Sequence, residues 1–168
     1  MKSQWQFSQR YVDVPAGIDR PKWRTTLSYR FAPTFQAGLE YNAAVGEADP
    51  IANWYAIRET DSSPALILGT SSDRIGTPRG RQAVFLTASK QIGNLPIAPY
   101  VSLNYSGADR RFNYPFGAAI QIAEVWTLMP MYDGQRAHTT LTWSGKNLSI
   151  SLLYIWNRRL GVSLGTYF

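Results

Sequence analysis

The chain has 168 residues, no cysteine and one histidine, which excludes disulfide scaffolds, thiolate zinc sites, cysteine nucleophiles and multi-histidine metal centres. Its net charge of +6 and isoelectric point near 9.7 would suit nucleic-acid binding, but the 17 lysines and arginines are scattered and form no basic run, which argues against a nucleic-acid partner. Aromatic residues make up 14% of the chain and charged residues only 17%, a mixture typical of a protein with one apolar and one polar face.

The N-terminal segment, MKSQWQFSQR, lacks the apolar core of a secretion signal. No segment approaches the ~18 consecutive apolar residues that a membrane helix requires. If the protein is secreted or resides in an outer membrane, we therefore expect this sequence to be the mature form, with the signal peptide absent.

Alternation of apolar and polar residues with a period of two recurs along the chain, whereas helical periodicity is nearly absent. WRTTLSYRF (23–31), FQAGLEY (35–41) and NLSISLLYIW (147–156) are examples. The pattern predicts a single all-β domain over residues 1–168 with about twelve strands, although ten or eight longer strands remain alternatives. The expected strands are at 3–13, 23–32, 34–43, 51–59, 65–73, 81–92, 97–106, 117–122, 125–133, 137–144, 147–156 and 160–168.

The connections between these segments alternate in length, which is typical of outer-membrane barrels with tight turns at one rim and longer loops at the other. The short connections, at 32–33, 60–64, 93–96, 123–124 and 145–147, define a short-turn rim. The longer ones, at 14–22, 43–50, 73–80 and 108–116, together with the brief DGQR and NRR connections, define a long-loop rim. An even strand count places both termini at the short-turn rim.

Aromatic residues gather where the expected strands end, as in the girdles at the two interfaces of membrane barrels. Strand ends carry aromatics in many β proteins, so this pattern alone does not decide the environment. The predicted girdle comprises Phe31, Phe35, Trp126, Trp143 and Phe168 at the short-turn rim and Tyr11, Trp23, Tyr41, Tyr132 and Trp156 at the long-loop rim.

Alternation does not reveal whether the apolar face points inward, as in a soluble lipocalin-like barrel, or outward toward lipid. Twelve strands enclose more volume than the mostly small residues of the second face could fill, so an apolar interior would be empty. The size of the barrel therefore favours an apolar exterior in a membrane.

The final strand, LGVSLGTYF, resembles the C-terminal assembly signal of bacterial outer-membrane β-barrels, in which apolar residues alternate back from a terminal aromatic. Leu160, Val162, Leu164 and Phe168 fit this pattern, whereas Thr166 departs from it. The resemblance implies a closed antiparallel transmembrane β-barrel in the bacterial outer membrane, inserted by a barrel-assembly machinery that recognises the last strand.

The predicted register directs Arg10, Arg24 and Arg30 inward, with Glu40 one strand further along. Buried like charges repel, so these arginines either form ion pairs with carboxylates such as Glu40 and Asp13, plugging the interior, or line a weakly anion-selective constriction. Both interpretations remain open.

Some outer-membrane barrels are lipid-modifying enzymes, so the single histidine, His138, is the residue to test. A lipid-acting triad has to face the membrane. The register instead places Thr139 and Leu141 on the lipid face and His138 in the lumen near the long-loop rim, as a hydrogen-bonding residue.

Charged rim residues could bind the phosphates of lipopolysaccharide or simply be solvated; they are Asp73, Arg74 and Arg79, with the segment GADRRFNYP as a second candidate. The sequence thus predicts a narrow passive pore or a membrane anchor and scaffold, in contact with the lipid bilayer and lipopolysaccharide. No cofactor or metal is expected, and a protein partner at the loops stays open. The alternatives are a soluble ligand-binding β-barrel and, less favoured, an outer-membrane lipid-modifying enzyme.

Overall fold

The computed structural model describes residues 4–15, 22–43, 46–72 and 80–168 and is built entirely from β-strands and connections. Within these ranges no helix is long and apolar enough to cross a membrane, a finding that does not bear on proteins that cross with strands. The strands are β1 (Trp5–Val12), β2 (Trp23–Ala32), β3 (Phe35–Asn42), β4 (Glu47–Ile57), β5 (Ala65–Ser72), β6 (Gln82–Ser89), β7 (Ile97–Ser106), β8 (Arg111–Asn113), β9 (Phe116–Ala123), β10 (Trp126–Tyr132), β11 (Ala137–Ser144), β12 (Leu148–Ile155) and β13 (Arg159–Tyr167).

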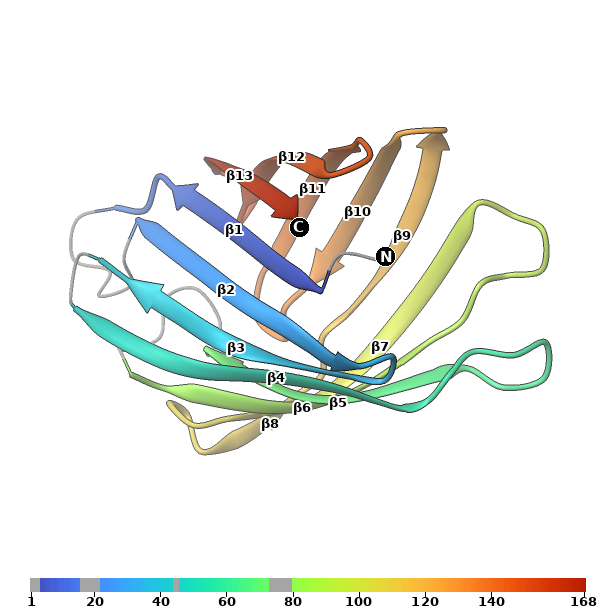
Figure 1. The fold of residues 1–168 in the computed structure, drawn as a ribbon, viewed down its shortest axis with the longest axis horizontal. Helices are drawn as coiled ribbons and strands as arrows, with labels where there is room; N and C mark the ends of the chain where they lie inside the picture. Colours follow the sequence, from blue (N-terminus) through green and yellow to red (C-terminus); the bar gives the residue numbers. More distant parts are fainter. Residues whose placement is uncertain (1–3, 16–21, 44–45, 73–79) are drawn as a thin grey trace.

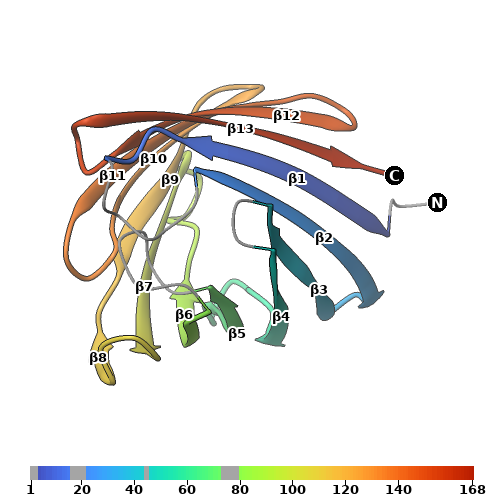
Figure 2. The same ribbon diagram turned by 90° about the vertical axis from the view of Figure 1, so that its left-hand side faces the viewer.

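Twelve of these strands form a closed antiparallel barrel (Figures 1 and 2). Each barrel strand pairs with the next one along the chain, and β1 pairs with β13 to close the ring. The seam runs from Gln6 opposite Tyr167 to Val12 opposite Gly161, and Trp5 and Phe168 exchange two backbone hydrogen bonds of 2.9 and 3.1 Å. The prediction of a closed twelve-stranded barrel is confirmed.

Both described chain ends lie side by side at one end of the barrel, the short-turn rim (Figures 1 and 2). The β2–β3 connection at this rim is only Pro33 and Thr34, and the β9–β10 connection is Glu124 and Val125. The β1–β2, β3–β4, β5–β6, β7–β9, β10–β11 and β12–β13 connections belong to the opposite, long-loop rim.

Two of the expected long connections contain strand. Residues 47–50, predicted as loop, form the start of β4, and the short β8 lies within the expected loop 108–116, where it pairs only with β7. Proline cannot donate a hydrogen bond to a ladder, and Gly46 directly precedes the strand. In the structure Pro50 lies opposite Leu39 within the β3–β4 ladder, and the glycine occupies the turn just before β4.

The apolar side chains form the outer wall of the barrel. Cross-strand pairs place Phe7 opposite Leu27, Leu27 opposite Leu39, and Leu152 opposite Val162. On this face Leu39 is 55% exposed and Val101 55%. A soluble protein rarely exposes so continuous an apolar surface, so this arrangement argues against the soluble ligand-binding barrel, which needs its apolar face inside.

Glycines on the inner wall allow neighbouring strands to bend closely around a narrow interior. A Cβ atom on Gly38 would collide with the backbone of Leu27 and Ser28, and one on Gly161 would lie 2.7 Å from the carbonyl oxygen of Tyr11. Because these contacts are with backbone atoms, no side-chain rotation could relieve them.

The assignment of the two faces predicts that neighbouring positions of β12 respond differently to a charge. We expect Ile150→Arg, on the outer wall, to lower the free energy of unfolding in a lipid bilayer by roughly 2–4 kcal/mol near the midplane, because the charge would face hydrocarbon. Ser149→Arg should cost much less, since Ser149 lies opposite Gly165 on the inner wall. Denaturant unfolding in vesicles measures both, and equal costs would contradict the assignment.

Candidate functional site

The interior of the barrel, the candidate site, contains an ion pair between neighbouring strands. Arg10 lies opposite Arg24 and Thr26 opposite Glu40, so these side chains share the inner wall. The Arg24 Nη1 atom lies 2.9 Å from Glu40 Oε2 and 3.2 Å from Ser72 Oγ. The Glu40 side chain is only 8% exposed, so the guanidinium supplies the charge that a buried carboxylate needs.

Hydrogen bonds also join side chains of separate strands along the inner wall. Gln36 Nε2 on β3 donates to Gln6 Oε1 on β1 at 3.0 Å and to Ser28 Oγ on β2 at 2.6 Å. Further round, hydroxyl pairs at 2.9 Å join Thr87 to Ser102 and Thr142 to Ser151. The inner wall is therefore polar on both sides of the barrel.

Two lumenal carboxylates, Glu47 and Asp49, were missed in the sequence. Asp49 lies directly opposite Glu40, and Glu47 lies opposite Asn42. The alternation of Glu47 and Asp49 with Ala48 and Pro50 was the available signal, but it falls in the segment assigned to a loop. Together with Glu40 they balance the three predicted lumenal arginines, so the inner wall carries charges of both signs.

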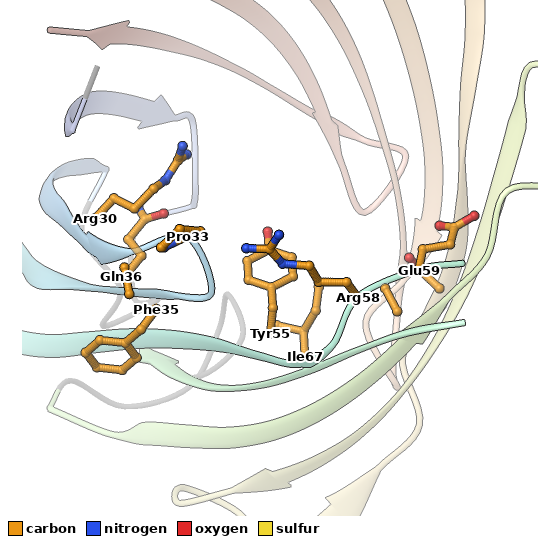
Figure 3. A pocket seen from close by; sticks show the side chains of 11 residues that line it. Arg30, Pro33, Phe35, Gln36, Tyr55, Arg58, Glu59 and Ile67 are labelled. Atoms are coloured by element: carbon orange, nitrogen blue, oxygen red, sulfur yellow. The ribbon is translucent and has the colours of Figure 1, made fainter. Parts of the chain in front are cut away.

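A cavity of about 550 Å³ opens at the short-turn rim (Figure 3). Arg30 and Gln36, from the β2–β3 hairpin, line one side of it, and Tyr55 and Arg58 line the other. Arg30 lies opposite Gln36, which itself lies opposite Asn53, so Arg30 belongs to the inner wall. Glu59 also lines the cavity, so this mouth carries two positive charges and one negative charge.

His138 lies on the inner wall near the long-loop rim, opposite Ile155, and is 5% exposed. Its Nε2 atom is 2.7 Å from Asp133 Oδ2, and its Nδ1 atom accepts a hydrogen bond from the Trp156 backbone N–H at 3.4 Å. These contacts occupy both ring nitrogens. In the described part of the chain, neither nitrogen has a serine or threonine hydroxyl as partner, so the geometry does not form a lipid-hydrolysing triad.

Six of the predicted girdle residues divide into two groups. Trp23, Tyr41, Trp126, Trp143 and Phe168 lie on the outer wall. Trp156 does not: strand β12 ends at Ile155, and Trp156 enters the turn with a φ of 55°. Its ring packs on an interior cluster of Val12, Val14, Leu153 and Ile155. The alternation that predicted an outward Trp156 fails because the turn interrupts the strand one residue earlier.

Two further points of the sequence analysis concern the charged rim residues and metal binding. The rim charges Asp73, Arg74 and Arg79 lie outside the described residues. Within the described ranges no group of three or more histidine, cysteine or acidic side chains could hold a metal ion.

The architecture is that of a bacterial outer-membrane β-barrel: a closed, even-stranded antiparallel ring with an apolar exterior and a polar interior. Neither the protein-family models nor the curated proteins compared with the sequence gave a match. Among solved structures, the barrel is similar to that of the NanC porin, with a TM-score of 0.53 and 11% sequence identity over 98% of each chain. At this identity, the likeness is one of fold.

The Asp133–His138 contact predicts a pH-dependent stability at the long-loop rim. Burial would raise the pKa of Asp133, but hydrogen bonds from His138 and from the backbone of Arg136 and Gln135, together with the charge of His138, lower it below its ordinary value. Since the folded pKa is the lower one, the stabilisation is complete above the unfolded carboxyl pKa of about 3.9 and is lost as the pH falls through the folded value.

We therefore expect the thermal midpoint of the wild type to fall more steeply below about pH 5 than that of Asp133→Asn, which lacks this carboxylate. Heat-modifiable gel mobility at a series of pH values measures the midpoint. Asp61→Asn, in the exposed β4–β5 turn, is the control and should parallel the wild type. Parallel curves for wild type and Asp133→Asn would show that the contact contributes nothing.

Proposed function

We propose that the protein resides in the outer membrane of a bacterium and forms a narrow passive pore. The observation that carries this proposal is the inverted polarity of the barrel, with exposed apolar residues outside and hydrogen-bonded polar and charged residues inside. An apolar exterior matches hydrocarbon, and a closed ring leaves no unpaired strand edge in it. The likeness in fold to the NanC porin supports the same conclusion.

The inner wall suggests how such a pore would select its solutes. Arg10 and Arg24 lie on β1 and β2, and Glu40 and Asp49 lie on β3 and β4, so a passing ion meets both signs. At the short-turn mouth, Arg30 and Arg58 add two positive charges and Glu59 adds one negative charge. Charged rings control selectivity in pores, so we propose a weak preference for small anions.

Contacts with the bilayer, with lipopolysaccharide and with an assembly machinery at the last strand stay predictions, as does a protein partner at the loops. A membrane anchor or scaffold is the second candidate. The ion pair of Arg24 with the nearly buried Glu40 favours it, because such pairs obstruct a narrow lumen.

Conductance of the detergent-refolded protein in a planar bilayer under a salt gradient tests the pore. We expect small discrete steps and a reversal potential that favours anions. Glu40→Gln removes a lumenal negative charge and should strengthen the anion preference, whereas Arg24→Gln should weaken it.

Lys146→Gln, in the exposed β11–β12 turn, changes the net charge like Arg24→Gln but lies outside the interior and is the matched control. Its reversal potential should equal that of the wild type. A folded, inserted but silent barrel would contradict the pore and favour the scaffold.

A further inference from the structure

A second cavity, of about 560 Å³, lies at the long-loop rim between the β10–β11 and β12–β13 turns. We call it the rim pocket; it is lined by Pro15, Trp156 and three arginines, Arg136, Arg158 and Arg159, with their immediate neighbours. It is separate from the cavity at the short-turn rim, which strands β2 to β6 line. Nothing in the pore proposal uses it.

The charge of the rim pocket is only partly neutralised. Asp13 is shared by two cations, with Arg159 Nη1 at 3.7 Å and Lys22 Nζ at 3.8 Å, and all three side chains are about half exposed. Exposed ion pairs of this length contribute little and are readily displaced. Within the described ranges, no carboxylate forms an ion pair with Arg136 or Arg158. The pocket therefore presents a surplus of guanidinium groups.

One of these guanidinium groups is held in place. The Arg136 Cζ atom lies 4.4 Å from the centre of the Trp156 ring, a cation–π contact that leaves the N–H edges of the guanidinium available to a ligand. Trp156 and the next residue, Asn157, both have positive φ angles, of 55° and 52°, which a tryptophan rarely adopts.

The unfavourable backbone geometry at Trp156 is compensated by a backbone hydrogen bond and by packing of the indole ring against the barrel interior. Its backbone N–H donates to His138 Nδ1, and the ring packs on the interior cluster of Val12, Val14, Leu153 and Ile155. The turn thus fixes Trp156 beneath Arg136. Because the Arg136 side chain is already ordered, a ligand that binds it loses less conformational entropy.

Arginines that line one cavity suit an oxyanion with several acceptor oxygens, because the paired N–H groups of a planar guanidinium bind phosphate bidentately. The pocket also reaches the outer wall, because Ala137 lines it and pairs with the outward Tyr132. We propose that the rim pocket binds a phosphate group, presented either by the headgroup of a phosphorylated membrane glycolipid or by a soluble phosphate. Arg136 and Arg158 supply the main contacts.

Binding to the detergent-refolded protein tests the proposal, with inorganic phosphate as one probe and lipopolysaccharide in phosphatidylcholine vesicles, with and without its phosphates, as the other. We expect wild type to bind at least one phosphorylated probe and the double variant Arg136→Gln/Arg158→Gln to bind it at least tenfold more weakly.

The control is Arg110→Gln, which removes one positive charge, as the single variant Arg158→Gln does, in the turn before β8, at the same rim but on the far side of the barrel from β12 and β13 (Figure 2). The affinity of this variant for the phosphorylated probe should lie within twofold of that of the wild type. Heat-modifiable mobility confirms folding, and the single variant Arg158→Gln, at an exposed position, replaces the double variant if the latter does not fold.

The outcomes separate the two sources of phosphate. Binding of inorganic phosphate supports a soluble ligand. Binding only of the vesicles whose lipopolysaccharide keeps its phosphates supports a lipid headgroup. The proposal is overturned if wild type binds neither probe, if dephosphorylated lipopolysaccharide binds equally well, or if Arg110→Gln weakens binding as much as the pocket variants. Because the readout is binding and not conductance, this result is independent of whether the lumen conducts.

Discussion

The two-residue period of the strands is the constraint on which the rest of the barrel depends. A shift of one residue in any ladder would move every apolar side chain of that strand to the interior and every polar one to the exterior. Cross-strand pairs keep Leu27, Leu39 and Leu152 outside, and Arg24 and Glu40 inside. Environment, interior chemistry and candidate function all follow from that single alternation.

The small size of the chain shapes what the interior can do. With strands of mostly seven to eleven residues, the inner wall combines short polar side chains and glycines with an apolar cluster that includes Leu153 and Ile155. Long side chains such as Arg24 and Gln36 reach partners on other strands. In the proposed pore, selectivity would therefore depend on a few charges and on where they lie along the lumen. The rim pocket adds a basic surface that belongs to the turns and not to the lumen.

The strand count, the closed ring and the outward apolar face could be predicted because alternation and turn spacing report them directly. Residues 47–50 were assigned to the long connection 43–50, but a ladder can tolerate a proline that lacks one donor, and these residues extend β4 and place Glu47 and Asp49 on the inner wall. Trp156 was placed outside because the sequence does not indicate which residue of a turn adopts a positive φ. The rim pocket could not be foreseen, since it includes Trp156, whose positive φ the sequence does not indicate, and Pro15, which follows β1 and comes near the last strands only when β1 pairs with β13.

The order of the strands also constrains how the chain can fold. Among the described strands, every barrel pairing except one joins consecutive barrel strands, while the seam joins β1 to β13 across nearly the whole chain. Local hairpins close with little loss of chain entropy, whereas the seam requires the ends of the sheet to meet. The sheet can therefore grow hairpin by hairpin as a curved, open ribbon. Its two unsatisfied edges disappear in one final step, when the last strand reaches the first.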